Sequence, residues 1–153
     1  MSNQGEMRMD KEVTILIADD DEGHADLIRR NLLRAGIVNP IKYFKDGQDI
    51  IDFLFQRGSG DHLINGNAYV LLLDIRMPKM DGVEVLQEIK KDEKLKKMPV
   101  VMITTTDDPR EVEACHLIGC NNYITKPVEY ESFVNAIKQL GLFLAVVQIP
   151  VIN

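Results

Sequence analysis

Short apolar runs alternate with amphipathic stretches five times along the chain. The apolar runs are mostly continuous and rich in β-branched residues, which is typical of strands that are covered on both faces. They occupy residues 13–18, 41–44, 70–73, 100–103 and 123–125. Strands that alternate with helices in this way form βα units around a parallel sheet. The pattern therefore predicts an α/β fold with five parallel, interior strands.

The amphipathic stretches have apolar residues at helical spacing and recognisable ends. The first carries Ala25, Ile28 and Leu32 and is followed by a glycine. The fourth opens with Asp108 as a candidate N-cap, followed by Pro109 at the first helical position. The predicted helices cover residues 22–35, 48–57, 83–91, from 108 onward and 130–147. We therefore expect one helix after each strand.

The remaining segments show no periodicity. Residues 58–67 (GSGDHLINGN) are rich in glycine and asparagine, which indicates a surface loop. A chain of 153 residues suits one domain with a single core. We expect a flexible N-terminal extension at 1–12, one domain at 13–147 and an apolar C-terminal tail at 148–153.

The formal net charge is −6, from 24 acidic and 18 basic residues. A chain of this charge is not attracted to DNA or to anionic lipid, so we expect no nucleic-acid partner and no membrane partner. The sequence also has no apolar run of the roughly 20 residues that a membrane helix needs, and no signal-peptide core near its start. These features indicate a cytoplasmic protein.

The cysteines and histidines form no recognisable metal or redox motif. Cys115 and Cys120 match neither a redox pair nor a zinc ligand set, and we expect small buried side chains. His24, His62 and His116 have no carboxylate or cysteine at ligand spacing, and we expect them on the surface or on a helix face.

Polar side chains follow the predicted strands where the chain leaves the sheet. Parallel strands all point the same way, so these residues share one rim, where open α/β sheets bind ligands. The rim residues are Asp19, Asp20 and Asp21 after the first strand, Asp74 after the third, Thr104 after the fourth, and Lys126 and Pro127 after the fifth. Carboxylates from two strands would repel each other strongly at one place unless a cation neutralised them.

Mg²⁺ is the cation that this rim favours, because its donors are hard oxygens without histidine or cysteine. The expected ligands are Asp20, Asp74 and a nearby backbone carbonyl. A carboxylate surrounded by a metal ion, a hydroxyl and an ammonium is also typical of an aspartate that accepts phosphate. Asp74 is the candidate nucleophile, and Thr104 and Lys126 could stabilise charge on the transferring phosphoryl group.

Four segments in order, ILIADDDE, LLLDIRMPKMDG, PVVMITTTDD and NYITKP, resemble the signature blocks of response-regulator receiver domains. The resemblance covers roughly residues 13–140, and Thr104 and Lys126 follow Asp74 by 30 (104 − 74) and 52 (126 − 74) residues, as in chemotaxis-type members. It implies a flavodoxin-like, doubly wound parallel sheet with strand order 2-1-3-4-5 and five helices. It also implies a chain that is not an enzyme beyond catalysing its own aspartyl phosphorylation and dephosphorylation.

The resemblance implies a metal site as well. Asp19 and Asp20 would hold Mg²⁺ together with Asp74, the phosphoryl acceptor. The backbone carbonyl of Arg76 would complete the coordination.

Further roles implied by the resemblance concern the bound phosphate. Thr104 and Lys126 would contact it, and Tyr123 would turn inward as the Thr104 hydroxyl moves. The bond between Lys126 and Pro127 would be cis, as it usually is in the family.

The resemblance implies a phosphorylation-dependent response regulator whose phosphoryl donor is a sensor histidine kinase. Without an output domain, it would signal through altered interaction with an unidentified downstream protein. The 58–67 loop and the apolar ending resemble single-domain regulators paired with bacterial phytochrome kinases. Other sensor kinases stay open as partners, and so does a role as a phosphorelay intermediate or phosphate sink.

Two functions of other classes are disfavoured by the same residues. Phosphatases of the haloacid-dehalogenase type act on small molecules with Mg²⁺ and place a second aspartate two residues after the nucleophile, where this chain has Arg76. A flavodoxin-like cofactor binder needs a phosphate-binding loop after the first strand, where this chain has three aspartates.

The C-terminal part has more apolar residues than one helix face requires. A core-facing stripe is already formed by Phe133, Ile137, Leu140 and Leu144. The remaining apolar residues are Leu142, Phe143, Val146, Val147, Ile149, Val151 and Ile152. An exposed apolar patch usually marks an interface, so we expect a homodimer through the last helix and the tail. The alternative is that the tail folds back on its own domain.

Overall fold

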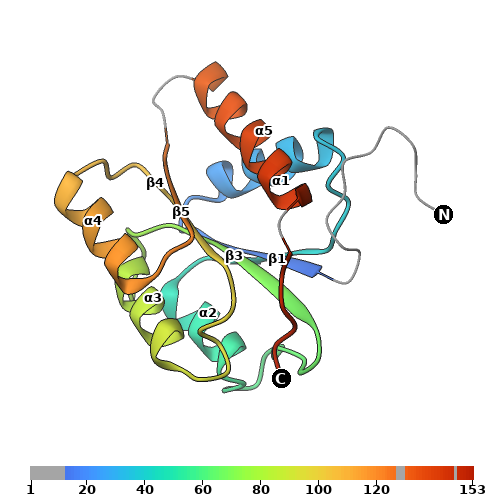
Figure 1. Ribbon diagram of the computed structural model, residues 1–153, viewed down its shortest axis with the longest axis vertical. Helices are drawn as coiled ribbons and strands as arrows, with labels where there is room; N and C mark the ends of the chain where they lie inside the picture. Colours follow the sequence, from blue (N-terminus) through green and yellow to red (C-terminus); the bar gives the residue numbers. More distant parts are fainter. Residues whose placement is uncertain (1–12, 127–129, 147) are drawn as a thin grey trace.

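The computed structural model describes residues 13–126, 130–146 and 148–153. Strands and helices alternate along these residues, as the hydrophobic pattern predicts (Figure 1). In chain order they are β1 (Val13–Ala18), α1 (Glu22–Arg34), β2 (Ile41–Phe44), α2 (Gly47–Leu54), β3 (Ala68–Leu73), α3 (Gly82–Lys91), β4 (Val100–Thr104), α4 (Pro109–Ile118), β5 (Asn122–Thr125) and α5 (Tyr130–Val146). The extension predicted at 1–12 lies outside the described residues.

The five strands form one parallel sheet in the order β2-β1-β3-β4-β5, which confirms the predicted order. Every residue of β3 and β4 is buried. The expectation of five interior strands is wrong for β2 and β5, because these strands form the two edges of the sheet and none of their residues is fully buried. Ile41, Phe44, Tyr123 and Ile124 pack partly against the two cores, although each of these strands has a neighbouring strand on one side only.

Helices cover both faces of the sheet. In Figure 1, α1 and α5 lie on one face, and α2, α3 and α4 lie on the other. Successive residues of a strand point to opposite faces. In β1, accordingly, Leu16 and Ala18 join the core with α2 and α3, whereas Ile15 and Ile17 join the core with α1 and α5. The two cores fix the C-terminal ends of the strands relative to one another.

Aspartate side chains begin four of the helices. The N-caps of α1, α2, α3 and α4 are Asp21, Asp46, Asp81 and Asp108. Each accepts a hydrogen bond from a backbone N–H in the first turn, which satisfies a donor that the helix itself leaves unpaired. At α3, Asp81 and Glu84 form a reciprocal capping box. The N-cap predicted at Asp108 is confirmed.

The C-terminal segment 148–153 folds back to the start of β3 (Figure 1). Val151 pairs with Ala68 in an antiparallel bridge. The Ile152 N–H donates to the Asn67 carbonyl at 2.8 Å, and the Gly66 N–H donates to the Ile152 carbonyl at 2.6 Å. The Ile152 side chain is 1% exposed and belongs to the core with α2 and α3. The alternative in which the tail folds back on its own domain is therefore the one observed.

This fold-back reduces the apolar surface on which the predicted dimer depended. Phe143 and Ile149 pack partly against the core with α1 and α5, while Leu142 and Val151 stay exposed. Val147 lies outside the described residues. Three of the surplus apolar residues, Phe143, Ile149 and Ile152, thus pack at least partly within the chain, and homodimerisation stays a prediction.

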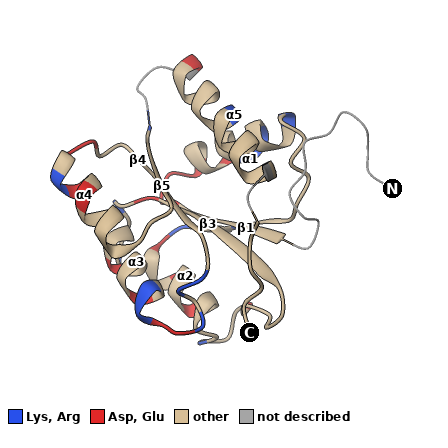
Figure 2. Ribbon diagram, in the orientation of Figure 1, with Lys and Arg blue, Asp and Glu red and all other residues tan. Residues whose placement is uncertain are grey.

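Residues of both charge signs are interspersed at the end of α3 and in its connection to β4 (Figure 2). Lys91 Nζ lies 3.8 Å from Glu88, and Lys96 Nζ lies 2.7 Å from Glu93. Such pairing is typical of a solvated helix end.

None of the described helices is both long and apolar enough to cross a bilayer.

The two cysteines are buried, as predicted. Burial raises the pKa of the Cys115 thiol to about 11 and also raises that of Cys120. Because the thiolate is the reactive form, both side chains are held in the inert state near neutral pH.

Candidate functional site

Three carboxylates meet at the C-terminal edge of the sheet. Asp19 and Asp20 follow β1 and Asp74 follows β3; the two strands are neighbours, with Ala18 aligned to Leu73. One carboxylate oxygen from each of the three aspartates lies within 4.8 Å of the other two. Asp19 and Asp74 are buried, and Asp20 is exposed. The parallel register thus brings together the acidic residues that the sequence predicts at one rim.

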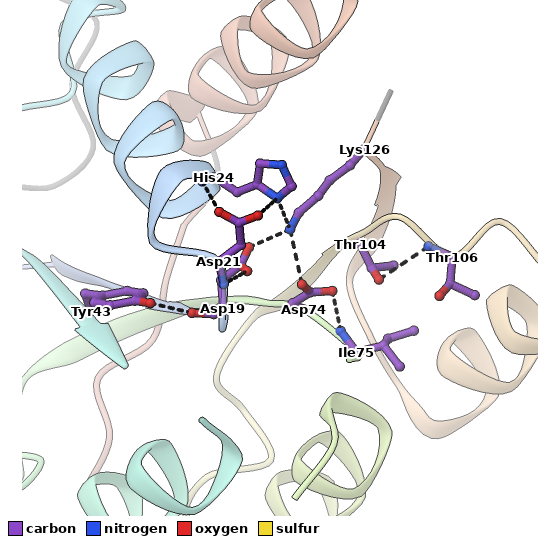
Figure 3. A network of polar contacts seen from close by, with 9 residues as sticks. All are labelled: Asp19, Asp21, His24, Tyr43, Asp74, Ile75, Thr104, Thr106 and Lys126. Carbon is purple, nitrogen blue, oxygen red and sulfur yellow. Dashed lines mark hydrogen bonds and ion pairs between the residues drawn. The ribbon is translucent and has the colours of Figure 1, made fainter. Parts of the chain in front are cut away.

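Lys126 reaches the two buried carboxylates from the end of β5 (Figure 3). Its ammonium donates to Asp19 Oδ2 at 2.6 Å and to Asp74 Oδ2 at 3.1 Å, and its side chain is 3% exposed. The Lys126 N–H donates to the Thr104 carbonyl at 2.6 Å, so the pairing of β4 with β5 continues up to the site. An ammonium between two carboxylates offsets part of the cost of burying these charges.

The cluster nevertheless has an excess of negative charge. Three carboxylates face one ammonium, so two negative charges are in excess when all three are ionised. Burial raises the pKa of Asp19 to about 6 from its ordinary 3.8, even though the hydrogen bond from Lys126 lowers it. The site therefore favours a proton or a metal cation at Asp19.

These residues fit a hard divalent cation. The clustered donors are all carboxylate oxygens, which Mg²⁺ and Mn²⁺ prefer, and a divalent charge would match the two excess negative charges. Asp19, Asp20 and Asp74 would hold the ion. The Arg76 carbonyl, two residues beyond Asp74 in the chain, stays a predicted ligand.

Backbone hydrogen bonds orient both buried carboxylates. The Ile75 N–H donates to Asp74 Oδ1 at 2.7 Å, and the Asp21 N–H donates to Asp19 Oδ1 at 2.9 Å (Figure 3). With Oδ1 held in this way, Oδ2 of each aspartate is the oxygen that faces the ammonium. The carboxylate of Asp74 is thus oriented by the chain itself.

The loop that follows Asp74 closes tightly on it. A Cβ atom at Gly82 would lie 2.0 Å from the Asp74 carbonyl oxygen, far inside van der Waals contact. The Gly82 N–H donates to the Ile75 carbonyl at 2.8 Å. Asp81 and Gly82 thus close the loop and start α3.

Thr104 and Tyr123 lie on the side of the site formed by β4 and β5. Thr104 is fully buried, and its hydroxyl accepts a hydrogen bond from the Thr106 N–H at 3.4 Å (Figure 3). The Tyr123 hydroxyl donates to the Thr106 carbonyl at 2.7 Å, and burial raises the pKa of Tyr123 to about 12. Thr104 and Tyr123, which the resemblance predicts to move together, thus both contact Thr106. The cis bond predicted before Pro127 lies outside the described residues.

His24 contacts this site, which the sequence reasoning missed. Its Nδ1 lies 3.1 Å from Lys126 Nζ (Figure 3). Its ring centroid lies 5.9 Å from that of Phe133. The predicted position on a helix face is correct but omits this contact. A signal was present in the chain: His24 follows Asp20 by four residues, about one helical turn, and helical side chains lean towards the N-terminus, here towards the rim.

Comparison with known proteins identifies the family. The model of the response regulator receiver domain matches residues 15–138. This chain belongs to that family. The matched residues contain all the rim positions of this receiver domain, from Asp19 to Lys126.

Solved receiver structures resemble this receiver domain closely. One from Rhodospirillum rubrum is 45% identical, with a TM-score of 0.85 over 92% of this chain and 99% of that chain. The Mn²⁺-bound form of response regulator Rcp1, a Synechocystis protein, is 30% identical, with a TM-score of 0.80 over 90% and 98% of the two chains. The bacteriophytochrome response regulator RtBRR is 36% identical, with a TM-score of 0.70 over 88% and 81%. A similar protein therefore binds a divalent metal ion.

Proposed function

We propose that this receiver domain is a cytoplasmic, phosphorylation-dependent response regulator that accepts a phosphoryl group on Asp74 from a sensor histidine kinase. The observation that carries the proposal is the environment of Asp74 Oδ2. It faces a buried ammonium at 3.1 Å and lies in a cluster with two further carboxylates. This arrangement provides both a nucleophile and the means to neutralise an incoming phosphoryl group.

Each residue of the site has a task in phosphoryl transfer. A carboxylate oxygen of Asp74 bonds to phosphorus while the bond from phosphorus to the kinase histidine nitrogen breaks, which leaves an acyl phosphate on Asp74. The Lys126 ammonium then pairs with one phosphoryl oxygen, and the Thr104 hydroxyl donates to another. Mg²⁺, held by Asp19, Asp20 and Asp74, supplies further neutralisation of phosphoryl charge when it is bound.

The signal passes from phosphate to surface through Thr106. When the Thr104 hydroxyl turns to the phosphoryl group, it releases the Thr106 N–H, and the carbonyl of Thr106 is the acceptor for Tyr123. A shift of these contacts changes the surface near α4 and β5. Phosphorylation would thereby favour one of two arrangements and alter binding to a downstream protein.

A bacteriophytochrome is the kinase partner that the comparisons favour, because RtBRR carries that association in its name and is similar over most of its length. Other sensor kinases could use the same site chemistry. A phosphorelay intermediate or a phosphate sink would also accept phosphate on Asp74. The intermediate would pass the phosphoryl group to another protein, whereas the sink would lose it to water as inorganic phosphate.

Phosphotransfer from a purified kinase tests the proposal. The full chain is mixed in Mg²⁺ buffer with a bacteriophytochrome kinase, or with an unrelated sensor kinase, that carries labelled phosphohistidine. We expect rapid transfer from the phytochrome kinase, and no transfer to Asp74→Asn or in the presence of EDTA. Asp61→Asn is the matched control, because Asp61 is exposed and pairs with Lys42 away from the site.

The possible outcomes separate the two parts of the proposal. Label on the Asp74→Asn variant would contradict the assigned acceptor. Transfer from the unrelated kinase alone would contradict the phytochrome pairing and leave the acceptor role standing. Label that moves on from Asp74 to a second histidine protein would identify a relay.

A homodimer through α5 is the remaining part of the proposal. Leu142 is 46% exposed near the end of α5, and a second copy would cover it. The tail contributes little, because Ile152 is buried in its own domain. Light scattering of the full chain, with and without a phosphoryl donor, should give a dimer mass in at least one state; a monomer mass in both would contradict the inference.

A further inference from the structure

The Lys126 ammonium has three acceptors around it. They are Asp19 Oδ2 at 2.6 Å, Asp74 Oδ2 at 3.1 Å and His24 Nδ1 at 3.1 Å (Figure 3). An ammonium has three N–H donors and no lone pair, so each donor has one acceptor. The contact with His24 therefore requires an unprotonated Nδ1, which places the proton of the neutral ring on Nε2.

His24 is held in position from two sides. Its backbone N–H donates to Asp21 Oδ1, the N-cap of α1, at 3.1 Å. Its ring lies against Phe133 of α5, with centroids 5.9 Å apart at an interplanar angle of 59°. Asp21 Oδ2 also lies 3.4 Å from Nδ1, but the tautomer that accepts from Lys126 has no proton there to donate. The ring thus links the start of α1, the α5 helix and the rim.

His24 differs in chemistry from the other two acceptors of Lys126. Both carboxylates belong to the acidic cluster, and a divalent ion would compete with the ammonium for them. A phosphoryl group bonded to Asp74 would likewise remove the negative charge of that carboxylate. A neutral imidazole is a weaker ligand for a hard cation than a carboxylate. His24 therefore keeps its hydrogen bond to the ammonium when the two carboxylates bind a metal ion or a phosphoryl group.

We propose that His24 is a positioning residue for Lys126. Its Nδ1 fixes the direction of the ammonium when a metal ion binds the carboxylates and a phosphoryl group is bonded to Asp74. The remaining N–H groups of Lys126 then point at the phosphoryl oxygens. The inference rests on the proposed function, since it assigns His24 a part in phosphorylation of Asp74. Because the acceptor is neutral, the full charge of Lys126 remains available to the phosphate.

Two substitutions separate positioning from packing. In His24→Asn, the amide oxygen lies close to the former Nδ1 and can still accept from the ammonium. In His24→Leu, a side chain of similar bulk still packs against Phe133 but has no acceptor. Both variants should have the thermal unfolding midpoint of the wild type to within a few degrees, because the His24 side chain is 39% exposed.

The measured quantity is the rate of phosphorylation of Asp74 by acetyl phosphate at saturating Mg²⁺, followed by intact-protein mass spectrometry. A small donor is used so that kinase docking plays no part. We expect His24→Leu to lower the maximal rate about tenfold, equivalent to about 1.4 kcal/mol, and His24→Asn to keep most of it. A Leu variant as fast as the wild type, or an Asn variant as slow as the Leu variant, would overturn the inference.

A spectroscopic measurement tests the contact independently of phosphorylation. Nitrogen-15 NMR of the histidine rings should show His24 as the Nε2–H tautomer in the wild type, and a mixture of tautomers in Lys126→Met. An Nδ1–H tautomer in the wild type would refute the positioning contact. If neither the wild type nor any variant accepts phosphate on Asp74, the proposed function is wrong. In that case the tautomer of His24 alone decides whether this residue positions Lys126.

Discussion

The C-terminal segment allows a quantitative test of the packing. Ile152 is 1% exposed and belongs to the core with α2 and α3, whereas its neighbour Val151 is 46% exposed. Replacing a buried isoleucine by alanine costs about 2–5 kcal/mol, from lost burial and from the cavity that remains. We expect the lower part of this range, about 2–3 kcal/mol, for Ile152→Ala, because a segment close to the chain end can partly collapse into the space.

Val151→Ala is the matched control, with an expected cost under about 0.5 kcal/mol because the side chain is partly solvated. Urea unfolding followed by circular dichroism gives the free energy of unfolding for each variant, since the chain has no tryptophan. The thermal midpoint of Ile152→Ala should fall by roughly 5–10 °C. Equal, small losses in both variants would refute the reasoning and mean that the tail is available to a second copy.

Other measurements address the site and its loop. Mg²⁺ affinity, measured by titration calorimetry from about pH 5 to 8, should weaken towards tenfold per pH unit below about pH 6, because Asp19 must lose its proton to bind the ion and its pKa is about 6; constant affinity would contradict the assignment. In the metal-free protein the same raised pKa means that the folded state holds this proton more tightly than the unfolded state. The proton on Asp19 therefore stabilises the fold fully below about pH 4, and this stabilisation is lost as the pH rises through 6. Urea unfolding should detect this decrease in the free energy of unfolding without Mg²⁺, and no such decrease when Mg²⁺ is present. Gly82→Ala should cost at least about 3 kcal/mol, because its Cβ would lie 2.0 Å from the Asp74 carbonyl oxygen, whereas Gly60→Ala, with open space around it, should be nearly neutral; similar unfolding midpoints for the two would argue against the tight loop.

The sheet and the rim follow from the sequence for a simple physical reason. Continuous apolar runs alternating with amphipathic stretches require a parallel sheet covered by helices, and parallel strands bring their C-terminal ends to one edge. Asp19 and Lys126 are 107 residues apart, and this topology is enough to place them together. The burial of Asp74 beside them follows from the same register.

Other features depend on contacts that no periodicity encodes. The surplus of apolar residues after Leu140 indicates a covered surface, but does not say whether the same chain or a second copy covers it. Backbone groups of Gly66 and Asn67 decide the matter, because they pair with Ile152. The contact of His24 with Lys126 was not predicted, for a related reason. Ligand spacing indicates metal sites, whereas this histidine contacts an ammonium group.

The identity of the phosphoryl acceptor is the central claim, and chemical trapping tests it most directly. The full chain is incubated with acetyl phosphate and Mg²⁺, reduced with borohydride, which converts an aspartyl phosphate to homoserine, and then digested for mass spectrometry. Homoserine is predicted at position 74, and none should form when EDTA removes the metal ion. Homoserine at another aspartate, such as the exposed Asp20, or at no position, would contradict the account.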